Sequence, residues 1–327
     1  MSRTVTVLAG GVGAARFLRG LIAAIPPDEV TAIVNVGDDT TLHGLMISPD
    51  IDTVTYTLAE TINPETGWGL AGETWQAIGQ VRRYAESNGI TETDAVGNDA
   101  AGWFALGDLD LGTHMYRTSR RLAGASLSQV TAEICRTWGL GLRVLPVSDD
   151  DVRTCVRTVD GRELSFQEYF VREHHEVEVA EVRFEGAETA APAPGVLDAI
   201  NDADVVCIAP SNPVVSIGPV LAVPGLREAA EAARERAVAV SPIVGGAALK
   251  GPADRLLREL GHEASVVGIA RWYAPIAATL VIDEVDADLA DAVRAEGVRC
   301  VVAPTIMTDR DAAAELARIC LAAVDAT

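Results

Sequence analysis

Hydrophobic positions near the two ends of the chain form short continuous runs, in which Val, Ile and Ala follow one another without polar alternation. Such runs are typical of parallel strands that are covered on both faces. Segments with helical periodicity lie between them, as in 225–236 and 311–324. The pattern predicts an α/β fold with a doubly wound, mostly parallel, Rossmann-like sheet, whose ligands lie beyond the carboxyl ends of the strands. The expected strands are 4–9, 30–36, 204–210, 237–243, 264–270, 278–283 and 298–304.

The middle of the chain has a different pattern. Residues 71–86 and 126–140 look like amphipathic helices, and Ser126 and Gln129 are spaced for a capping box at the start of the second. Residues 152–170 are expected to form a hairpin. We therefore expect an inserted helical and hairpin cap.

The boundaries of the two parts follow from this change of pattern. Residues 1–60 and 201–327 are expected to form the Rossmann-like core that binds nucleotide and phosphate, and residues 61–200 the inserted cap.

Composition narrows the class of protein. No apolar run approaches the about 18–20 residues of a membrane span. The N-terminus leads directly into a strand without the layout of a signal peptide, so we expect a cytoplasmic protein. Five scattered cysteines without a C-x-x-C pair indicate reduced thiols and no zinc site.

The chain is strongly acidic, with 26 basic and 47 acidic residues and a net charge of −21. This charge argues against nucleic acid as a partner, because phosphate backbones are bound by clustered Lys and Arg. An anionic ligand would have to be held by helix N-termini, a few basic residues or a metal ion.

The glycine cluster "AGGVGAAR" follows the first expected strand, and we expect Gly10, Gly11 and Gly13 to let backbone N–H groups approach a phosphate. The dinucleotide fingerprint is incomplete, because Arg16 stands where its third glycine should be. A tight turn between strand and helix without a ligand is the alternative.

Acidic residues follow the second expected strand. Asn35, Asp38 and Asp39 come directly after it, and Asp50 and Asp52 lie two positions apart in "SPDIDT". In an extended segment the last two would point the same way. Carboxylates beside a phosphate loop favour a bound cation, and oxygen ligands suit Mg²⁺. The alternative is a solvated acidic loop in which Asp50 caps a helix.

Polar residues in the cap and after later strands are further candidates. Segment 105–118 holds Asp108, Asp110, His114 and Arg117, for which a structural role remains an alternative. Two other loops offer groups for a base or a phosphate, namely Ser211, Asn212 and Pro213 in 209–219 and Lys250 in 241–255. The residues alone thus predict a phosphorylated ligand or nucleotide at the carboxyl edge of the sheet, with Mg²⁺.

Seven motifs in order carry a resemblance to a known family: "GGVGAARFLRGL", "SPDIDTVTYTLA", "LGDLDLGTH", "SDDDVRT", "FQEYFV", "PSNPVVSIGP" and "SPIVGGAALKGPA". Together they resemble the 2-phospho-L-lactate transferase family of deazaflavin coenzyme biosynthesis, from Leu8 to about Met307. The resemblance implies the fold expected above. It also implies Mg²⁺-dependent transfer of a phospho-three-carbon acid from a guanosine diphosphate-linked donor to the ribitol hydroxyl of 8-hydroxy-5-deazaflavin (Fo).

In that reaction GMP leaves, and the product is coenzyme F-420 without glutamates. The chain most resembles the actinobacterial branch, for which the donor is expected to carry enolpyruvyl in place of lactyl, giving the dehydro product.

The resemblance also implies roles for residues. Gly10, Gly11 and Gly13 would hold donor phosphates, and Ser211, Asn212 and Pro213 would line the nucleotide site near Lys250. Asp50 and Asp52 would hold Mg²⁺, place the Fo hydroxyl, or both, and either could take its proton. Asp108, Asp110 and His114, in the cap, would contact Fo or complete the metal site, and we also expect Asn35 and Asp38 to bind substrate.

Two alternatives remain at this point. A related branch of nucleotide-sugar-binding regulatory proteins shares the glycine loop and core sheet, although the motifs of the cap favour the transferase. An NAD-dependent oxidoreductase is disfavoured by Arg16 and by Asn35, which replaces the acidic residue expected after the second strand. The apolar faces of cap helices suggest a homodimer.

Overall fold

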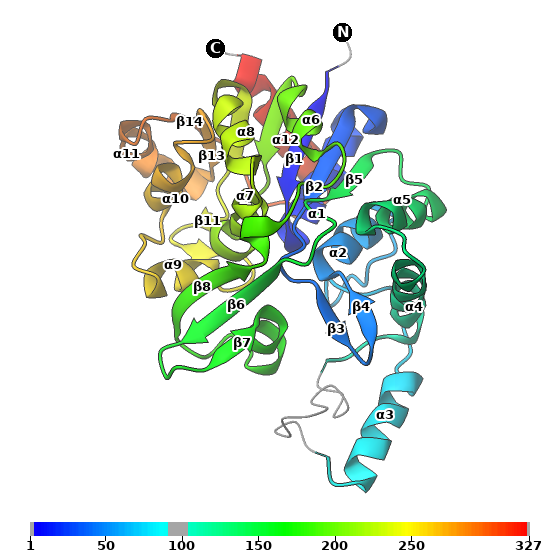
Figure 1. Ribbon diagram of the computed structural model, residues 1–327. Helices are drawn as coiled ribbons and strands as arrows, with labels where there is room; N and C mark the ends of the chain where they lie inside the picture. Colours follow the sequence, from blue (N-terminus) through cyan, green and yellow to red (C-terminus); the bar gives the residue numbers. More distant parts are fainter. Residues whose placement is uncertain (1–2, 91–103, 326–327) are drawn as a thin grey trace.

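The computed structural model describes residues 3–90 and 104–325 (Figure 1). Its centre is a parallel sheet of seven strands, ordered β14-β13-β10-β9-β1-β2-β5. In that order the strands are β14 (Arg299–Val302), β13 (Thr279–Ile282), β10 (Ala237–Val240), β9 (Val205–Ile208), β1 (Val5–Ala9), β2 (Val30–Val34) and β5 (Arg143–Pro146).

The inner strands are buried on both faces, as their continuous apolar runs predicted. Every residue of β1, β9, β10 and β13 is buried. The two edge strands, β5 and β14, are partly exposed. The predicted α/β, doubly wound fold is confirmed.

Helices cover both faces of the sheet. Helix α1 (Gly11–Ala24) packs against α2 (Pro49–Leu58) and α12 (Arg310–Asp325). Since parallel connections are right-handed, helices after β1 and β2 cover one face, and those after β9, β10 and β13 the other. The sheet is also flanked by further helices, namely α5 (Leu127–Thr137), α6 (Val196–Asn201), α7 (Gly218–Ala222), α8 (Leu226–Ala232), α9 (Ala253–Glu259), α10 (Val266–Tyr273) and α11 (Ala290–Ala295).

One expected strand is wrong. Residues 264–270 belong mostly to helix α10, whose N-cap Ser265 accepts a hydrogen bond from the backbone of Gly268. Its buried residues recur with helical spacing, at positions 266, 269, 270 and 273. The short apolar run matched a buried strand and a buried helix equally well, and the capping serine marks it as a helix.

One strand was missed. Strand β5 lies within residues 61–200, the stretch assigned to the cap, yet it pairs with β2 at the edge of the main sheet. Helix α5 packs against β5, so this part of the stretch extends the core.

Smaller elements gather at the carboxyl end of the sheet, in the lower half of Figure 1. The expected hairpin is β6 (Arg153–Thr158) with β7 (Glu163–Ser165), and β8 (Val179–Glu185) pairs with the other edge of β6. Helix α4 (Asp108–Leu122) lies across from it, beside the hairpin of β3 (Thr40–Leu42) and β4 (Leu45–Ile47). Short remaining elements are β11 (Ile243–Val244), β12 (Ala247–Ala248), the π-helical turns η3 (Glu168–Arg172) and η5 (Pro213–Ile217), and the 3-10 turns η1 (Pro27–Glu29), η4 (Ala187–Thr189), η6 (Arg234–Arg236) and η7 (Glu284–Leu289).

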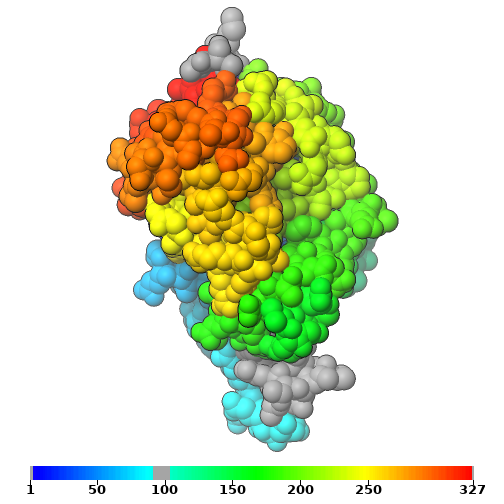
Figure 2. All heavy atoms as spheres, turned by 90° about the vertical axis from the view of Figure 1, so that its left-hand side faces the viewer, coloured from blue at the N-terminus to red at the C-terminus, as the bar shows by residue number. Residues whose placement is uncertain are grey.

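Helix α3 (Gln76–Ser87) projects from the body of the protein, as Figures 1 and 2 show. It buries only Ile78 and Ala85. Within the part of the chain that the structure describes, no helix is both long and apolar enough to cross a membrane.

Candidate active site

A cavity of about 440 Å³ opens at the carboxyl ends of the strands. Loops after β1, β2, β9 and β10 line it together with α2, α4 and η3. Most residues predicted for the site meet here: Gly10, Gly11, Gly13, Asp38, Asp50, Asp52, His114, Ser211, Asn212 and Lys250.

The glycine cluster lies where the strand order reverses, between β1 and β9. A Cβ on Gly13 would lie 2.1 Å from the carbonyl oxygen of Pro210, and Gly11 has a φ of +70°. The hydroxyl of Ser211 donates to the carbonyl of Gly10 at 2.7 Å. These glycines therefore let the loops after β1 and β9 pack against each other.

A carboxylate of the protein itself lies at the N-terminus of α1. The backbone N–H of Gly11 donates to Asp50, and the Asn35 amide donates to the Asp50 Oδ2 at 2.9 Å. The Asn35 Oδ1 in turn accepts from the backbone of Gly37 at 2.7 Å. Asn35 is fully buried behind the cavity and holds Asp50 in place.

Two further buried carboxyl groups, those of Asp38 and Asp39, lie near Asp50. Burial raises its pKa to about 6, against the lowering effect of the hydrogen bonds from Asn35 and Gly11. Burial and the charges of Asp50 and Asp39 raise the pKa of Asp38 well above its usual range. Burial likewise raises the pKa of Asp39, which accepts a hydrogen bond from Ser48 at 2.7 Å. One oxygen each of Asp38 and Asp39 is buried without a hydrogen-bond partner, an arrangement that fits a bound cation.

Asp52 belongs to a different environment. The segment that holds Asp50 and Asp52 is helical and not extended, because both residues lie in the first turn of α2. Positions two apart on a helix are about 200° apart around its axis, so the two carboxylates point to different sides. The expectation that they point the same way is wrong.

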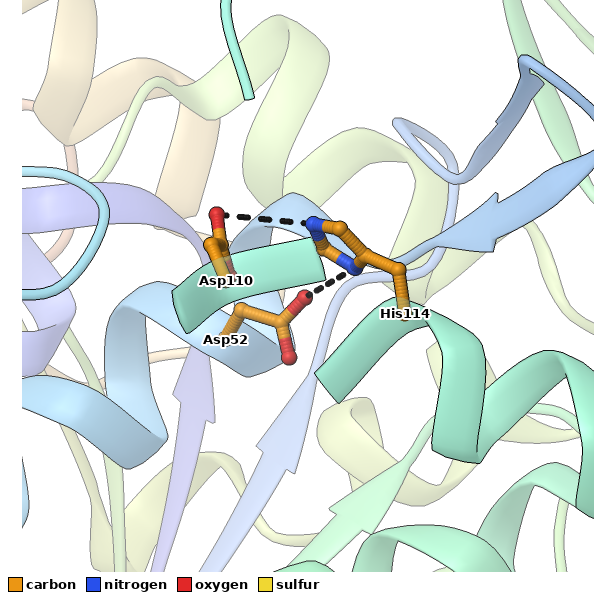
Figure 3. Close-up of side chains that lie close together, drawn as sticks. All are labelled: Asp52, Asp110 and His114. Carbon is orange, nitrogen blue, oxygen red and sulfur yellow. Dashed lines mark ion pairs between the residues drawn. The ribbon is translucent and has the colours of Figure 1, made fainter. Parts of the chain in front are cut away.

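The second environment is a network between α2 and α4 (Figure 3). The guanidinium of Arg117 forms an ion pair with the Asp52 Oδ1. His114 lies between two carboxylates, with its Nδ1 3.8 Å from the Asp52 Oδ2 and its Nε2 3.4 Å from the Asp110 Oδ2. The Tyr56 hydroxyl donates to the Asp110 Oδ1 at 2.7 Å. On each helix these residues are three or four positions apart, so they share one face of that helix, and the two faces are turned toward each other.

This network also contains a possible metal-binding group. Within residues 3–90 and 104–325, potential ligand atoms of Asp52, Asp110 and His114 lie within 4.8 Å of one another. Arg117 already occupies one oxygen of Asp52 and lies 3.2 Å from the Nδ1 of His114. Within the described residues no ion pair joins Asp38 or Asp50 to a basic side chain, although the charge of Arg117 lowers the pKa of the nearby Asp39. The carboxylates of Asp38 and Asp50 therefore fit Mg²⁺ better.

Asp108 and Pro213 lie outside the lining of the cavity. The Asp108 carboxylate accepts from the backbone of Gln76 and Ala77 and from the Thr74 hydroxyl, so it caps α3. Pro213 is buried at the start of η5, where the Asn212 side chain accepts from the backbone of the next turn. In these positions Asp108 stabilises the start of α3, and Pro213 begins the turn η5.

Two kinds of lining residue complete the cavity. Arg16 and Lys250 bring positive charge to it. Phe166 and Phe170 stack with ring centroids 5.4 Å apart and form an aromatic wall. The motif "FQEYFV" favoured the transferase from sequence without naming single residues, and its two Phe residues, spaced four apart, are the signal that marks this wall.

Comparison with known proteins gives a consistent result. The model of the family described as 2-phospho-L-lactate transferase CofD matches residues 5–318. A protein of Kitasatospora aureofaciens named phosphoenolpyruvate transferase is 48% identical, with 97% of each chain covered. Proteins with the same name from Streptomyces griseus and Nocardia farcinica are 47% and 42% identical, and the matches cover 96% of this chain and 96% and 92% of theirs.

Among solved structures, a Bacillus halodurans protein of the UPF0052 family is similar in fold. Its TM-score is 0.60 at 19% sequence identity, and the match covers 98% of this chain and 99% of that one. At this identity the similarity concerns the fold alone.

Proposed function

Since the chain belongs to the 2-phospho-L-lactate transferase CofD family, we propose that it transfers a phosphoenolpyruvyl group, or its lactyl counterpart, from a guanosine diphosphate-linked donor to the ribitol hydroxyl of Fo. GMP is the leaving group, and the product is (dehydro) coenzyme F-420 without glutamates. Enolpyruvyl is the favoured donor group, because the relatives at 42–48% identity are named phosphoenolpyruvate transferases.

One observation supports this proposal most strongly: a single cavity combines an aromatic wall with a cluster of buried acids. The stacked Phe166 and Phe170 suit a flat, largely apolar ring such as a deazaflavin. Arg16 and Lys250 suit the phosphates of the donor. The acids Asp38, Asp50 and Asp52 line the same cavity, so one site offers groups for the ring, the phosphates and the reacting hydroxyl.

The proposed reaction breaks one bond and forms another at phosphorus. The ribitol hydroxyl attacks the phosphorus that carries the three-carbon acid, and the bond from this phosphorus to the GMP oxygen breaks. The proton of the hydroxyl passes to a carboxylate. Asp52 is the proposed acceptor, because it lines the cavity and its Oδ2 has no hydrogen-bond partner.

We further propose that Asp50, with Asp38 beside it, holds Mg²⁺. Both carboxylates line the cavity, and burial raises the pKa of each in the absence of a cation. In proteins Mg²⁺ is commonly held by one or two carboxylates together with substrate phosphates. When bound, the ion would neutralise charge on the phosphate oxygens of the donor.

The test is a turnover assay in which purified protein and Fo receive both guanosine-linked donors in competition. Mass spectrometry separates the two products, because they differ by two hydrogens. We expect the dehydro product, an equal amount of GMP and loss of turnover when EDTA removes divalent cations. Asp52→Asn should abolish turnover, whereas Asp288→Asn should not, because Asp288 is exposed and is not a lining residue.

Absence of either product, together with failure to bind Fo, would contradict the proposal. Binding of a nucleotide sugar in that case would favour the regulatory alternative.

A further inference from the structure

Arg117 is the largest fully buried side chain of the described residues, and only 2% of that side chain is exposed. A buried guanidinium is costly unless it is paired and hydrogen-bonded. Its Nη2 pairs with the Asp52 Oδ1, and its Nη1 lies 3.2 Å from the His114 Nδ1 and 3.4 Å from the carbonyl oxygen of Met46. Arg117 therefore joins the two helices of the network.

The contact between Arg117 and His114 decides where the imidazole carries its proton. A guanidinium has five N–H donors and no acceptor. The His114 Nδ1 must therefore offer its lone pair to Arg117, which leaves the ring proton on Nε2. That nitrogen faces the Asp110 Oδ2 at 3.4 Å, and Tyr56 holds the other oxygen of Asp110.

Three polar atoms of the network are buried without a hydrogen-bond partner, the Asp52 Oδ2, the His114 Nε2 and the Arg117 Nε, and the first of these is the only carboxylate oxygen among them. Arg117 occupies the Oδ1 of Asp52 and the Nδ1 of His114, so neither is available to a divalent cation. The Asp52 Oδ2 is buried and has no hydrogen-bond partner. It is the oxygen assigned above to the proton of the acceptor hydroxyl.

We infer that Arg117 is a positioning residue, which holds His114 as the Nε2–H tautomer and orients Asp52 so that its Oδ2 remains available to the acceptor. The statement about the tautomer stands on the contacts of Arg117 alone. The statement about Asp52 rests on the proposed function.

The first test needs no substrate. In a ¹⁵N NMR spectrum of the labelled full-length protein, the His114 signals are identified by their loss in His114→Gln. We expect the signature of an unprotonated Nδ1 and a protonated Nε2. A protonated Nδ1, in either the other tautomer or an imidazolium, would overturn the inference.

The second test uses Arg117→Lys, which keeps the charge but replaces a rigid fork with a point donor. We expect mixed tautomers of His114 and a kcat lowered by about 100-fold, the scale expected for a misplaced catalytic group. The KM values of donor and acceptor should stay within about threefold of the original, since positioning acts after binding.

Arg120→Lys is the matched control, because Arg120 lies on the same helix and forms a partly exposed pair with Glu133. It should change neither readout. If Arg117→Lys leaves kcat and the His114 signals as they are, the inference is wrong. If Arg117→Lys does not fold, the spectrum of the unaltered protein still decides the tautomer. Absence of turnover in the unaltered protein would count against the proposed function and leave the tautomer result standing.

Discussion

Asp50 and Asp52 are two residues apart on one helix, yet they lie in opposite electrostatic environments. Asp50 has the acids Asp38 and Asp39 near it, and burial raises the pKa of all three. Asp52 faces Arg117, which compensates its charge within the protein. Asp38 and Asp39 each keep one buried oxygen without a hydrogen-bond partner, whereas Asp52 has a basic side chain of the protein paired with it.

The difference teaches that adjacent carboxylates need not form one site. Helix geometry sends the two side chains to different neighbours, and those neighbours determine their chemistry. The Asp50 region is suited to hold a divalent ion, and the Asp52 region is suited to orient a fixed acceptor for a proton. The following predictions change one region and leave the other unaltered.

The largest expected effect is on stability. Asp52→Asn leaves the buried Arg117 without its ion-pair partner, so we expect a loss of about 3–5 kcal/mol in the free energy of unfolding. Asp50→Asn removes a charge from a region with too many, so the metal-free protein should be at least as stable at pH 8. Urea unfolding of both variants measures this. If both variants lose the same free energy of unfolding, the proposed difference between the surroundings of Asp50 and Asp52 is wrong.

The second prediction concerns pH. Asp50 keeps its proton in the folded protein up to about pH 6, whereas the unfolded chain loses it near pH 4. The folded state then binds more protons, so the free energy of unfolding of the metal-free protein should fall as pH rises from 4 to 7. The share of Asp50 is about 3 kcal/mol, at about 1.4 kcal/mol per pKa unit.

Thermal unfolding across this pH range checks the prediction, with Asp50→Asn as the control that should flatten the profile. Added Mg²⁺ should restore stability most at the upper end, where the carboxylates are ionised. The same pH profile in the unaltered metal-free protein and in Asp50→Asn would contradict the raised pKa of Asp50.

The third prediction concerns the glycine cluster on the Asp50 side. Gly13→Ala forces a Cβ against the carbonyl of Pro210, and we expect a loss of about 1–3 kcal/mol. Gly11→Ala places a side chain at a φ of +70°, which costs about 1–2 kcal/mol. Gly79→Ala, where no atom lies within 4 Å of the added Cβ, should not destabilise the protein. A tolerated Gly13→Ala would show that the two loops do not need this close approach.

The smallest expected effect is that of Asp108→Ala, at the end of α4 away from Arg117. Loss of the cap on α3 should cost about 1 kcal/mol and speed hydrogen exchange in that helix alone. Turnover should be nearly unchanged, because Asp108 does not line the cavity. A loss of turnover as large as that expected of Asp52→Asn would place Asp108 in the reaction instead.

Sequence reasoning was most successful where one segment carries its own signal. Six of the seven expected strands form the sheet, and Ser126 and Gln129 form the predicted capping box of α5. It failed where a short apolar run fits two structures, as at 264–270. It also failed at β5, a partly exposed edge strand whose Arg143 and Pro146 interrupt the apolar pattern. In these segments the local sequence pattern is too weak to distinguish helix from strand, and packing against the rest of the protein determines which one forms.

By itself, the sequence determined the α/β class, the order of the motifs, the glycine loop and the candidate acids, because periodicity and local turn chemistry act over a few residues. Only the tertiary structure decided what each acid faces. It put Asp50 on the N-terminus of α1, Asp52 against Arg117, and Asp108 on the backbone of α3. The sequence shows where a carboxylate stands in the chain. Its pKa and its partners depend on residues tens of positions away, which only the folded protein brings together.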